Sequence, residues 1–379
     1  MNLFDVYPLY DITPVKGTGV YVYEENGTEY LDLYGGHAVI SIGHSHPAYT
    51  KAICEQVGKL GFYSNSIHNP LQDELAEKLE KASGIKDYSL FLCNSGAEAN
   101  ENALKLASFH TGKSRIIYFE NAFHGRTSGV VAVTDNETIK APFNTHNPVT
   151  KLAFEDLKGL EEALAKKEVA AVIFEVIQGV GGLDEATTEF YRSTSELCKK
   201  YKTVLIADEV QSGYGRTGDF FAFMKHGIRP DIISIAKGMG NGFPIGGVLI
   251  DHSIQAKYGL LGTTFGGNHL ACAAGIAVLD VIEKENLQQN AKDLFEYVKL
   301  KSAEIPQIKR LKGRGLMIGL EFDFEIAALR KELLFNHRVF TGASSNKKLL
   351  RILPPLNIEK EHFDRFFEAL KIALANQSK

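Results

Sequence analysis

The sequence predicts an α/β fold in which a doubly wound layer is joined to a smaller α+β domain. From about residue 48 to residue 268, segments with helical periodicity alternate with short apolar segments typical of buried strands. After Asn268 the pattern becomes mostly helical, with one strand pattern near residues 316–322. This order of elements favours a sheet covered by helices, followed by a second unit of different architecture.

The elements can be placed in order along the chain. Residues 19–23 and 29–33 alternate around Asn26-Gly27, which predicts a β-hairpin. Strands are expected at residues 89–93, 115–119, 130–133, 169–176, 203–207, 231–236 and 247–250. Helices are expected at residues 71–82, 97–110, 188–201, 271–283 and 360–375. We therefore expect an N-terminal segment (1–48) associated with the small domain, a large domain (49–268) and a small C-terminal domain (269–379).

Composition narrows the classes of function. Lys and Arg total 42 and Asp and Glu total 46, so the formal charge of −4 offers no basic excess for nucleic acid or an anionic membrane. The longest apolar run, residues 169–174, is too short to span a bilayer. Asp5 interrupts the opening residues, and the 4 cysteines show neither a disulfide framework nor metal-binding spacing. We expect a cytoplasmic protein without a signal peptide or a bound metal.

The first motif with chemical meaning is Asn94-Ser95-Gly96-Ala97-Glu98, which follows a predicted strand. Ser95 and Glu98 match the S-x-x-E capping box at the start of a helix. The unpaired N–H groups of a helix start, with Gly96 permitting close approach, suit a phosphate. A well-capped helix without a ligand also explains this motif, so it does not identify a site by itself.

Two further motifs place charged residues at predicted strand ends. The strand that ends in Asp208-Glu209 puts acids at the carboxyl edge of the sheet, where their burial requires a cation or a metal as partner. Lys237 follows the strand at residues 231–236, where a desolvated amine with a lowered pKa could form a Schiff base. Taken singly, a helix cap or a surface ion pair explains the acids, and a lysine that extends to solvent explains Lys237.

These three features together point to pyridoxal phosphate as the cofactor. The helix start would hold the phosphate, the carboxylate would keep the pyridine nitrogen protonated, and the lysine would carry the aldehyde. In an α/β layer, all three loops leave the carboxyl ends of strands, which is the edge where ligands bind.

The order of the motifs resembles that of the class III (subgroup II) aminotransferases, and within them the acetylornithine aminotransferase family. The resemblance runs nearly from end to end of the chain. Besides the motifs above it rests on Tyr30-Leu31-Asp32, Ile42-Gly43-His44-Ser45-His46-Pro47, Phe123-His124-Gly125-Arg126-Thr127, Gln211-Ser212-Gly213 and Thr264-Phe265-Gly266-Gly267-Asn268. It implies a fold type I pyridoxal-phosphate enzyme, with a mostly parallel seven-stranded sheet in the large domain. It also implies a homodimer with shared active sites.

The resemblance implies that several residues bind the cofactor. Lys237 would be the Schiff-base lysine, and Asp208 would pair with the pyridinium nitrogen. Val210 and Phe123 would cover the two faces of the ring, and Gln211 would bond its phenolic oxygen. The phosphate would be bound by a further set, the last of which reaches it from the other subunit: Ser95, Gly96, Ala97 and Thr264.

The resemblance also implies the substrate-binding residues. Arg126 would bind the distal carboxylate, Arg351 would bind the α-carboxylate of glutamate, and Thr263 would contact the substrate. A guanidinium fork fits a carboxylate bidentately, although a structural ion pair also explains either arginine. The implied reaction moves the δ-amino group of N-acylornithine, acetyl or succinyl, to 2-oxoglutarate. Its products are the N-acyl-glutamate semialdehyde and glutamate, in arginine biosynthesis.

One position departs from the family pattern. Val180 stands where relatives commonly have a Glu that pairs with the C-terminal arginine while the diamine is bound. Because Val180 cannot form that pair, Arg351 would stay unpaired, and we hypothesise that a more acidic acyl group such as succinyl is accepted. The alternative is that a neighbouring acid compensates.

Two other functions are open. Ornithine δ-aminotransferase, or another class III ω-aminotransferase, is compatible with residues 123–127 and Arg351. Outside the class, residues 213–218 fit the G-x-G-x-x-G pattern of a nicotinamide-dependent oxidoreductase. Against that reading, residues 208–212 separate the glycines from the strand, and Asp231 lies too close to serve as the ribose-binding acid.

Overall fold

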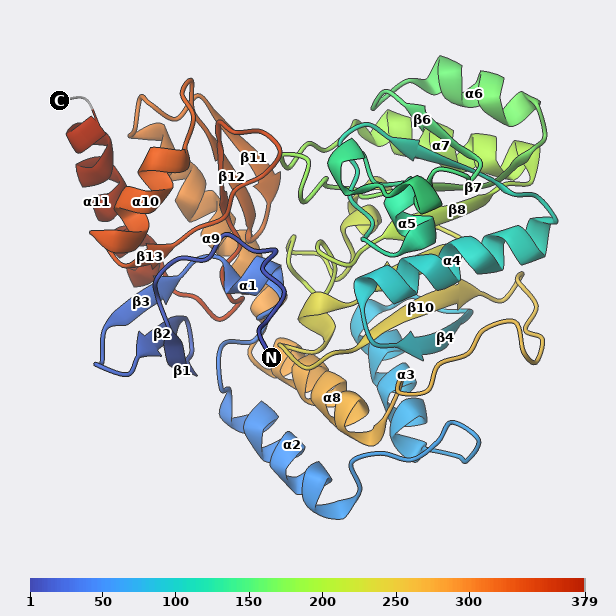
Figure 1. Ribbon diagram of the computed structural model, residues 1–379, viewed down its shortest axis with the longest axis horizontal. Coiled ribbons are helices and arrows are strands. Elements are labelled where there is room, and N and C mark those ends of the chain that lie inside the picture. Colours follow the sequence, from blue (N-terminus) through green and yellow to red (C-terminus); the bar gives the residue numbers. More distant parts are fainter. Residues whose placement is uncertain (378–379) are drawn as a thin grey trace.

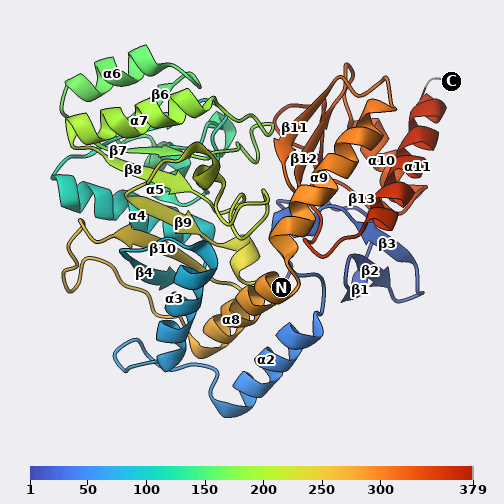
Figure 2. The same cartoon turned by 180° about the vertical axis from the view of Figure 1, so that it is seen from behind.

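The computed structural model describes residues 1–377 and divides into two lobes (Figure 1). The larger lobe holds the middle of the chain. The smaller lobe brings the N-terminal strands against the C-terminal part of the chain, as Figure 2 shows from behind. Within the described residues, no helix has the length and apolar character needed to cross a membrane.

The larger lobe is built on a seven-stranded sheet with the order β4-β10-β9-β8-β7-β5-β6. Its strands are β4 (Tyr88–Cys93), β5 (Arg115–Phe119), β6 (Val149–Leu152), β7 (Val169–Phe174), β8 (Val204–Asp208), β9 (Ile232–Ile235) and β10 (Gly246–Asp251). β10 pairs antiparallel with β4 and β9, whereas the other pairs are parallel. The mostly parallel seven-stranded sheet implied by the family resemblance is confirmed.

Helices cover both faces of this sheet. Along β5, Ile117 and Phe119 pack in one core, while Ile116 and Tyr118 pack in the other. One face is covered by α4 (Gly96–Thr111) and α5 (Ser128–Ala132), and the other by α3 (Pro70–Ser83), α6 (Leu157–Ala165) and α7 (Thr188–Tyr201) (Figures 1 and 2). Burial on both faces explains why the central strands are continuous apolar runs.

The predicted strand at residues 130–133 is wrong, because residues 130–132 form the end of α5 and Val133 is its C-cap. The run is buried, and a short apolar run does not distinguish a strand from a buried helical turn. The start of α5 is capped by a residue of another helix. Glu101 on α4 accepts hydrogen bonds from the Thr127 hydroxyl and from the N–H groups of Gly129 and Val130, at 2.7, 2.7 and 3.2 Å.

The smaller lobe contains two sheets, with the orders β11-β12-β14 and β1-β2-β3-β13. Their strands are β1 (Pro14–Thr18), β2 (Tyr21–Glu24), β3 (Glu29–Asp32), β11 (Arg310–Arg314), β12 (Met317–Glu321), β13 (Val339–Phe340) and β14 (Leu349–Ile352). The predicted hairpin is confirmed as β2 and β3, and β3 also pairs in parallel with β13. The helices of this lobe are α9 (Leu287–Ala303), α10 (Ala327–Phe335) and α11 (Lys360–Gln377).

The remaining helices are α1 (Gly35–Ala38), α2 (Pro47–Lys59) and α8 (His269–Lys284), with short 3₁₀ helices η1 (Glu137–Ile139), η2 (Pro142–Asn144), η3 (Ala222–His226) and η4 (Lys237–Met239). α8 begins where we place the small domain, yet it packs against α2 and α3. The domain boundaries therefore stay a prediction.

Candidate active site

The loops that leave the carboxyl ends of β4, β8 and β9 surround one cavity of about 420 Å³. Most of the residues singled out in the sequence line it: Ser95, Gly96, Ala97, Phe123, Arg126, Asp208, Val210, Gln211 and Lys237. These residues are distant in the sequence. β5, β8 and β9 run parallel, and β4 runs in the same direction because β10 pairs antiparallel with both β4 and β9, so the ends of these strands meet at one edge of the sheet.

The N-terminus of α4 forms part of the cavity wall. The Ser95 hydroxyl accepts a hydrogen bond from the Glu98 N–H at 3.2 Å, as the capping motif predicts. The Glu98 carboxylate accepts from the Asn94 N–H at 2.7 Å instead of from Ser95, so the reciprocal half of the capping box is displaced by one residue. In the described part of the chain, the N–H groups of Gly96 and Ala97 have no acceptor. A helix start with free N–H groups binds anions.

Asp208 ends β8 and is 4% exposed. Its Oδ2 accepts hydrogen bonds from Asn100 Nδ2 and His124 Nδ1, both at 2.7 Å, and its Oδ1 accepts from the Val210 N–H at 3.0 Å. These contacts fix the orientation of the carboxylate. The His124 and Asn100 contacts escaped the sequence analysis, because no spacing rule connects α4, the loop after β5 and the end of β8.

The neighbouring acid, Glu209, has a structural role. Its carboxylate accepts hydrogen bonds from the Ser212 hydroxyl at 2.7 Å, the Ala222 N–H at 3.0 Å and the Phe223 N–H at 2.9 Å. Burial raises the pKa of Glu209 to about 7, although these bonds oppose the shift. The two adjacent acids therefore serve different purposes, since Asp208 lines the cavity and Glu209 secures the start of η3.

Lys237 lies two residues after the end of β9, as the first residue of η4, and lines the same cavity. Burial lowers the pKa of its amine, while the charges of Asp208 and Glu175 act in the opposite direction. Its backbone has a φ of 45°, a conformation that is strained for a residue with a side chain. A buried amine with a lowered pKa is a nucleophile and a base at moderate pH.

Glu175 also lines the cavity, and the sequence analysis did not assign it a role. One carboxylate oxygen accepts from the Phe123 N–H at 2.9 Å and the other from the Gly179 N–H at 2.8 Å. Burial raises the pKa of Glu175 to about 7. Glu175 therefore connects the loop that carries Phe123 to the loop that carries Gly179. The sequence did not indicate this role, because Glu175 falls within an apolar pattern that predicts a strand.

Three further residues border the cavity. A Cβ on Gly96 would lie 2.6 Å from Val210 Cγ1, so the Val210 side chain packs directly on the start of α4. Gln211 Oε1 is buried and has no hydrogen-bond partner among the described residues, and a buried acceptor of this kind requires a donor. Arg126 is exposed, and its guanidinium carbon lies 5.9 Å from the centre of the Phe123 ring.

Arg351 lies on β14 in the smaller lobe, is 4% exposed and is not among the residues that line the cavity. Its Nε donates to the Ala343 carbonyl oxygen at 2.5 Å, and its Nη1 donates to the Gly179 carbonyl oxygen at 2.6 Å. Burial lowers the pKa of Arg351, while Tyr34 and Glu175 oppose that shift. Within the described residues, neither Arg351 nor Arg126 forms an ion pair with a carboxylate. Arg126 is therefore exposed at the cavity, whereas Arg351 is buried beside it and has N–H groups that these two bonds do not use.

The two threonines stand apart from the cavity wall. The Thr263 hydroxyl accepts from the Gly266 N–H at 3.0 Å and contacts Asn94 Nδ2 at 3.5 Å. Thr264 is exposed. A single copy of the chain therefore does not bring Thr263 or Thr264 to the cavity.

An α/β layer that presents a helix N-terminus, a buried carboxylate and a desolvated lysine to one cavity defines a pyridoxal-phosphate-dependent enzyme of fold type I. The model of the family "Aminotransferase class-III" matches residues 6–374, and the chain belongs to this family. The nicotinamide alternative is wrong, because residues 213–218 lie in a series of turns instead of at a strand-to-helix junction.

Individual relatives agree with this assignment. The acetylornithine aminotransferase of Aquifex aeolicus is 41% identical over 382 residues, covering 97% of this chain and 98% of its own. That of Bacillus subtilis is 39% identical over 383 residues, covering 100% and 98%. Among solved structures, the ornithine aminotransferase of Toxoplasma gondii has a TM-score of 0.90 at 29% identity, covering 98% and 92%. The acetylornithine aminotransferase of Elizabethkingia anophelis has a TM-score of 0.84 at 30% identity, covering 98% and 95%.

Class III aminotransferases depend on pyridoxal phosphate, and the cavity fits this cofactor. The free N–H groups at the start of α4 suit its phosphate. The fixed carboxylate of Asp208 suits a protonated ring nitrogen, and the amine of Lys237 suits an aldehyde. The unpartnered Gln211 Oε1 offers an acceptor to a further polar group of the cofactor.

Proposed function

We propose that this enzyme transfers the δ-amino group of an N-acylated ornithine, acetyl or succinyl, to 2-oxoglutarate, in arginine biosynthesis. Relatives that are 39–41% identical over nearly the whole chain carry the name acetylornithine aminotransferase. The observation that carries the proposal is a pair of guanidinium groups without carboxylate partners in the described residues: Arg126 lines the cavity with Lys237, and the charge of Arg351 acts on Lys237 from the smaller lobe. Such a pair suits a reaction whose acceptor and product have two carboxylates.

Each cofactor-binding residue has a proposed task. Ser95, Gly96 and Ala97 hold the phosphate, and Asp208 accepts a hydrogen bond from the ring nitrogen. A further set contacts the ring and its phenolic oxygen: Phe123, Val210 and Gln211. When bound, pyridoxal phosphate supplies an electron sink for the substrate carbon that loses a proton.

Lys237 has two tasks in this proposal. Its Nζ would carry the cofactor aldehyde. As a free amine, Nζ would hold and move the proton of the substrate carbon that bears the reacting amine. Burial suits Nζ to this work, because the lowered pKa leaves more of the amine uncharged.

Substrate binding is assigned to both lobes. Arg126 binds the distal carboxylate, Arg351 binds the α-carboxylate of glutamate or 2-oxoglutarate, and Thr263 contacts the substrate. The guanidinium fork matches a carboxylate with two parallel hydrogen bonds. N-acylornithine places no carboxylate beside its δ-amino group, so it does not engage Arg351 in the same way.

The acyl group follows from Val180. Arg351 donates to two carbonyl oxygens and, within the described residues, forms no ion pair with the nearby Glu175, whose two oxygens accept backbone N–H groups. We therefore favour acceptance of an acidic acyl group such as succinyl. Turnover of N-succinylornithine and N-acetylornithine should be compared, and a clear preference for the acetyl substrate would contradict this part of the proposal.

Ornithine δ-aminotransferase is the second candidate, because a solved structure of that name superposes with a TM-score of 0.90. A substrate panel with 2-oxoglutarate as acceptor separates the candidates. We expect acylated ornithines to be turned over faster than free ornithine. Faster turnover of free ornithine would favour the second candidate.

The variant Lys237→Ala tests the chemistry itself. We expect turnover to fall by at least about 10³-fold, because both the covalent attachment and the proton transfer are lost. Borohydride treatment of the wild-type enzyme should attach the cofactor to Lys237, as peptide mass mapping would detect. A Lys237→Ala variant with full activity would contradict the proposal.

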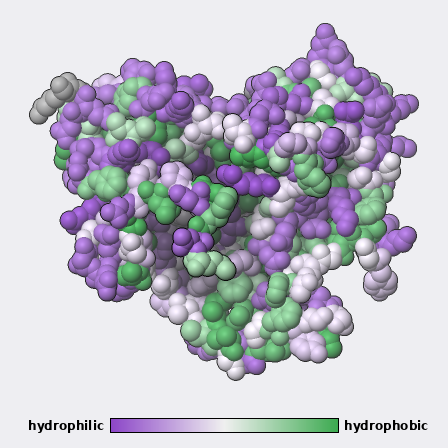
Figure 3. All heavy atoms as spheres, viewed as in Figure 1, coloured by the Kyte–Doolittle hydropathy of each residue, from purple (hydrophilic) through white to green (hydrophobic). Residues whose placement is uncertain are grey.

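We further propose a homodimer that acts in the cytoplasm. Large apolar side chains are exposed on and after α2 and near Thr264: Val57, Leu60, Phe62, Tyr63, Ile67, Tyr258 and Phe265. Figure 3 shows hydrophobic residues gathered over α2 and the chain that follows it. Exposed apolar patches of this kind mark interaction surfaces. Thr264 would reach the phosphate of the partner subunit from here, and an active monomer in light-scattering measurements would contradict this.

A further inference from the structure

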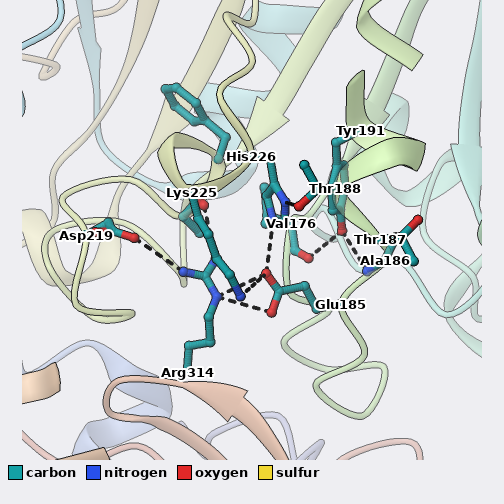
Figure 4. A network of polar contacts seen from close by, with 12 residues as sticks. Val176, Glu185, Ala186, Thr187, Thr188, Tyr191, Asp219, Lys225, His226 and Arg314 are labelled. Atoms are coloured by element: carbon teal, nitrogen blue, oxygen red, sulfur yellow. Dashed lines mark hydrogen bonds and ion pairs between the residues drawn. The ribbon is translucent and has the colours of Figure 1, made fainter. Parts of the chain in front are cut away.

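A polar network joins the two lobes around Arg314 and Glu185 (Figure 4). Arg314 ends β11 in the smaller lobe, and its Nε lies 3.0 and 3.1 Å from the two carboxylate oxygens of Glu185. Its Nη1 lies 3.4 Å from an Asp219 oxygen, and its Nη2 donates to the Ala222 carbonyl oxygen at 3.0 Å. All three partners belong to the larger lobe. A planar guanidinium that binds several partners fixes the position of β11 relative to the larger lobe. A lysine, whose ammonium lies on a flexible chain, would fix it less well.

Glu185 is held on its other side by the larger lobe. Its Oε1 lies 3.0 Å from His226 Nε2 and 3.6 Å from Lys225 Nζ. His226 is 2% exposed, and its Nδ1 lies 2.9 Å from the Thr188 hydroxyl. Burial opposes ionisation of Glu185, but the bond to His226 and the charges of Arg314 and Lys225 outweigh burial and lower its pKa. The carboxylate is therefore a fixed and charged anchor for Arg314.

This network is connected to Arg351 by two routes. In the smaller lobe, β11 pairs with β12, and β12 pairs with β14, which carries Arg351. In the larger lobe, residues 175–187 carry both Glu185 and Gly179, whose carbonyl oxygen accepts from Arg351 Nη1 at 2.6 Å. The same loop therefore holds the β11-β12-β14 sheet at Arg314 and at Arg351.

We propose that Arg314 and Glu185 are positioning residues for the acceptor substrate, because their ion pair holds the β11-β12-β14 sheet so that Arg351 faces the site. The inference rests on the proposed function, in which Arg351 binds the α-carboxylate of 2-oxoglutarate. N-acetylornithine has no carboxylate beside its reacting amine and does not need Arg351. Loosening the sheet therefore impairs one half of the reaction and spares the other.

The test replaces Arg314 with Met in the holoenzyme. The half-reaction with N-acetylornithine and the half-reaction with 2-oxoglutarate are measured separately, and the Kd of 2-oxoglutarate is measured by calorimetry. We expect the KM and Kd for 2-oxoglutarate to rise about 10- to 100-fold, as small misplacements of a binding group do. The rate with N-acetylornithine should stay unchanged. Arg314→Lys, which keeps the charge, should recover part of the loss and provides a second variant if Arg314→Met folds poorly.

Arg310→Met is the matched control. Arg310 lies on the same strand, but its side chain is 69% exposed and stands 3.8 Å from Glu321, so its loss should leave both half-reactions unchanged. A double-mutant cycle with Glu185→Gln should show that the second change adds little to the first. Equal losses in both half-reactions, or no loss in either, would overturn the inference. Failure of the proposed function is recognised separately, because Arg351→Met would then leave the Kd of 2-oxoglutarate unaltered.

Discussion

The two sides of the site are built by different means. On the larger-lobe side, Asp208 and Lys237 lie at the ends of the paired strands β8 and β9, so backbone hydrogen bonds set their relative position. On the smaller-lobe side, Arg351 is held by side-chain bonds to the carbonyl oxygens of Gly179 and Ala343. Backbone pairing survives most side-chain changes, whereas a contact across lobes depends on individual residues. We therefore expect substitutions of surrounding residues to leave the positions of Asp208 and Lys237 largely unchanged and to displace Arg351 more readily.

The largest effect is expected for Asp208→Asn, which tests the larger-lobe side. The amide keeps the shape of the carboxylate but loses the charge that would stabilise a protonated ring nitrogen. We expect kcat to fall by about 10²- to 10³-fold, the usual result of removing an electrostatic stabiliser from a buried site. Steady-state kinetics and the visible spectrum of the bound cofactor check this. A near-normal kcat would contradict the role of Asp208.

Glu209→Ala tests whether the acid next to Asp208 contributes to stability instead of to catalysis. Three donors lose their acceptor, namely the Ser212 hydroxyl and the N–H groups of Ala222 and Phe223. We expect the free energy of unfolding to fall by about 2–4 kcal/mol, with kcat per folded molecule unchanged. Urea unfolding and a titration of active sites measure the two quantities. A loss of kcat as large as that of Asp208→Asn would remove the distinction between the two acids.

A smaller effect is expected in the pH dependence of stability. Burial raises the pKa of Glu175 and Glu209 to about 7, so the folded protein keeps protons that the unfolded chain releases. Their contribution to stability is complete below the unfolded pKa and is lost as the pH rises through about 7. The Tm should therefore fall between about pH 5 and pH 8, and Glu209→Gln should reduce that fall. Calorimetry that finds the same fall in the variant would contradict the raised pKa of Glu209.

The sequence predicted the larger-lobe side better than the smaller-lobe side, for a physical reason. Asp208 and Lys237 follow short apolar strands, and a strand end is a local feature of the sequence. The edge strand β6 escaped prediction, because its four residues, three half-buried and one exposed, carry little pattern. α5 was predicted as a strand, because the carboxylate that caps it comes from Glu101 on another helix.

The sequence patterns did not predict contacts between segments that are far apart in the sequence. Asn100 and His124 bind Asp208 across separations of 108 and 84 residues, and no periodicity connects them. Glu185 and Arg314 are 129 residues apart. The seven-stranded sheet itself was implied by the family resemblance, since the strand patterns included one false strand and omitted β6.

The most direct test of the contrast between the two sides is the pair of half-reaction rates in Arg351→Met. Each half-reaction is followed by rapid mixing, with N-acetylornithine in one experiment and 2-oxoglutarate in the other. We expect kcat/KM for 2-oxoglutarate to fall by about 10²-fold or more, as when a buried bidentate partner of a carboxylate is removed, while the rate with N-acetylornithine is unchanged. Equal losses in both half-reactions would contradict the division of the site into a larger-lobe side that carries Asp208 and Lys237 and a smaller-lobe side that binds the α-carboxylate of 2-oxoglutarate.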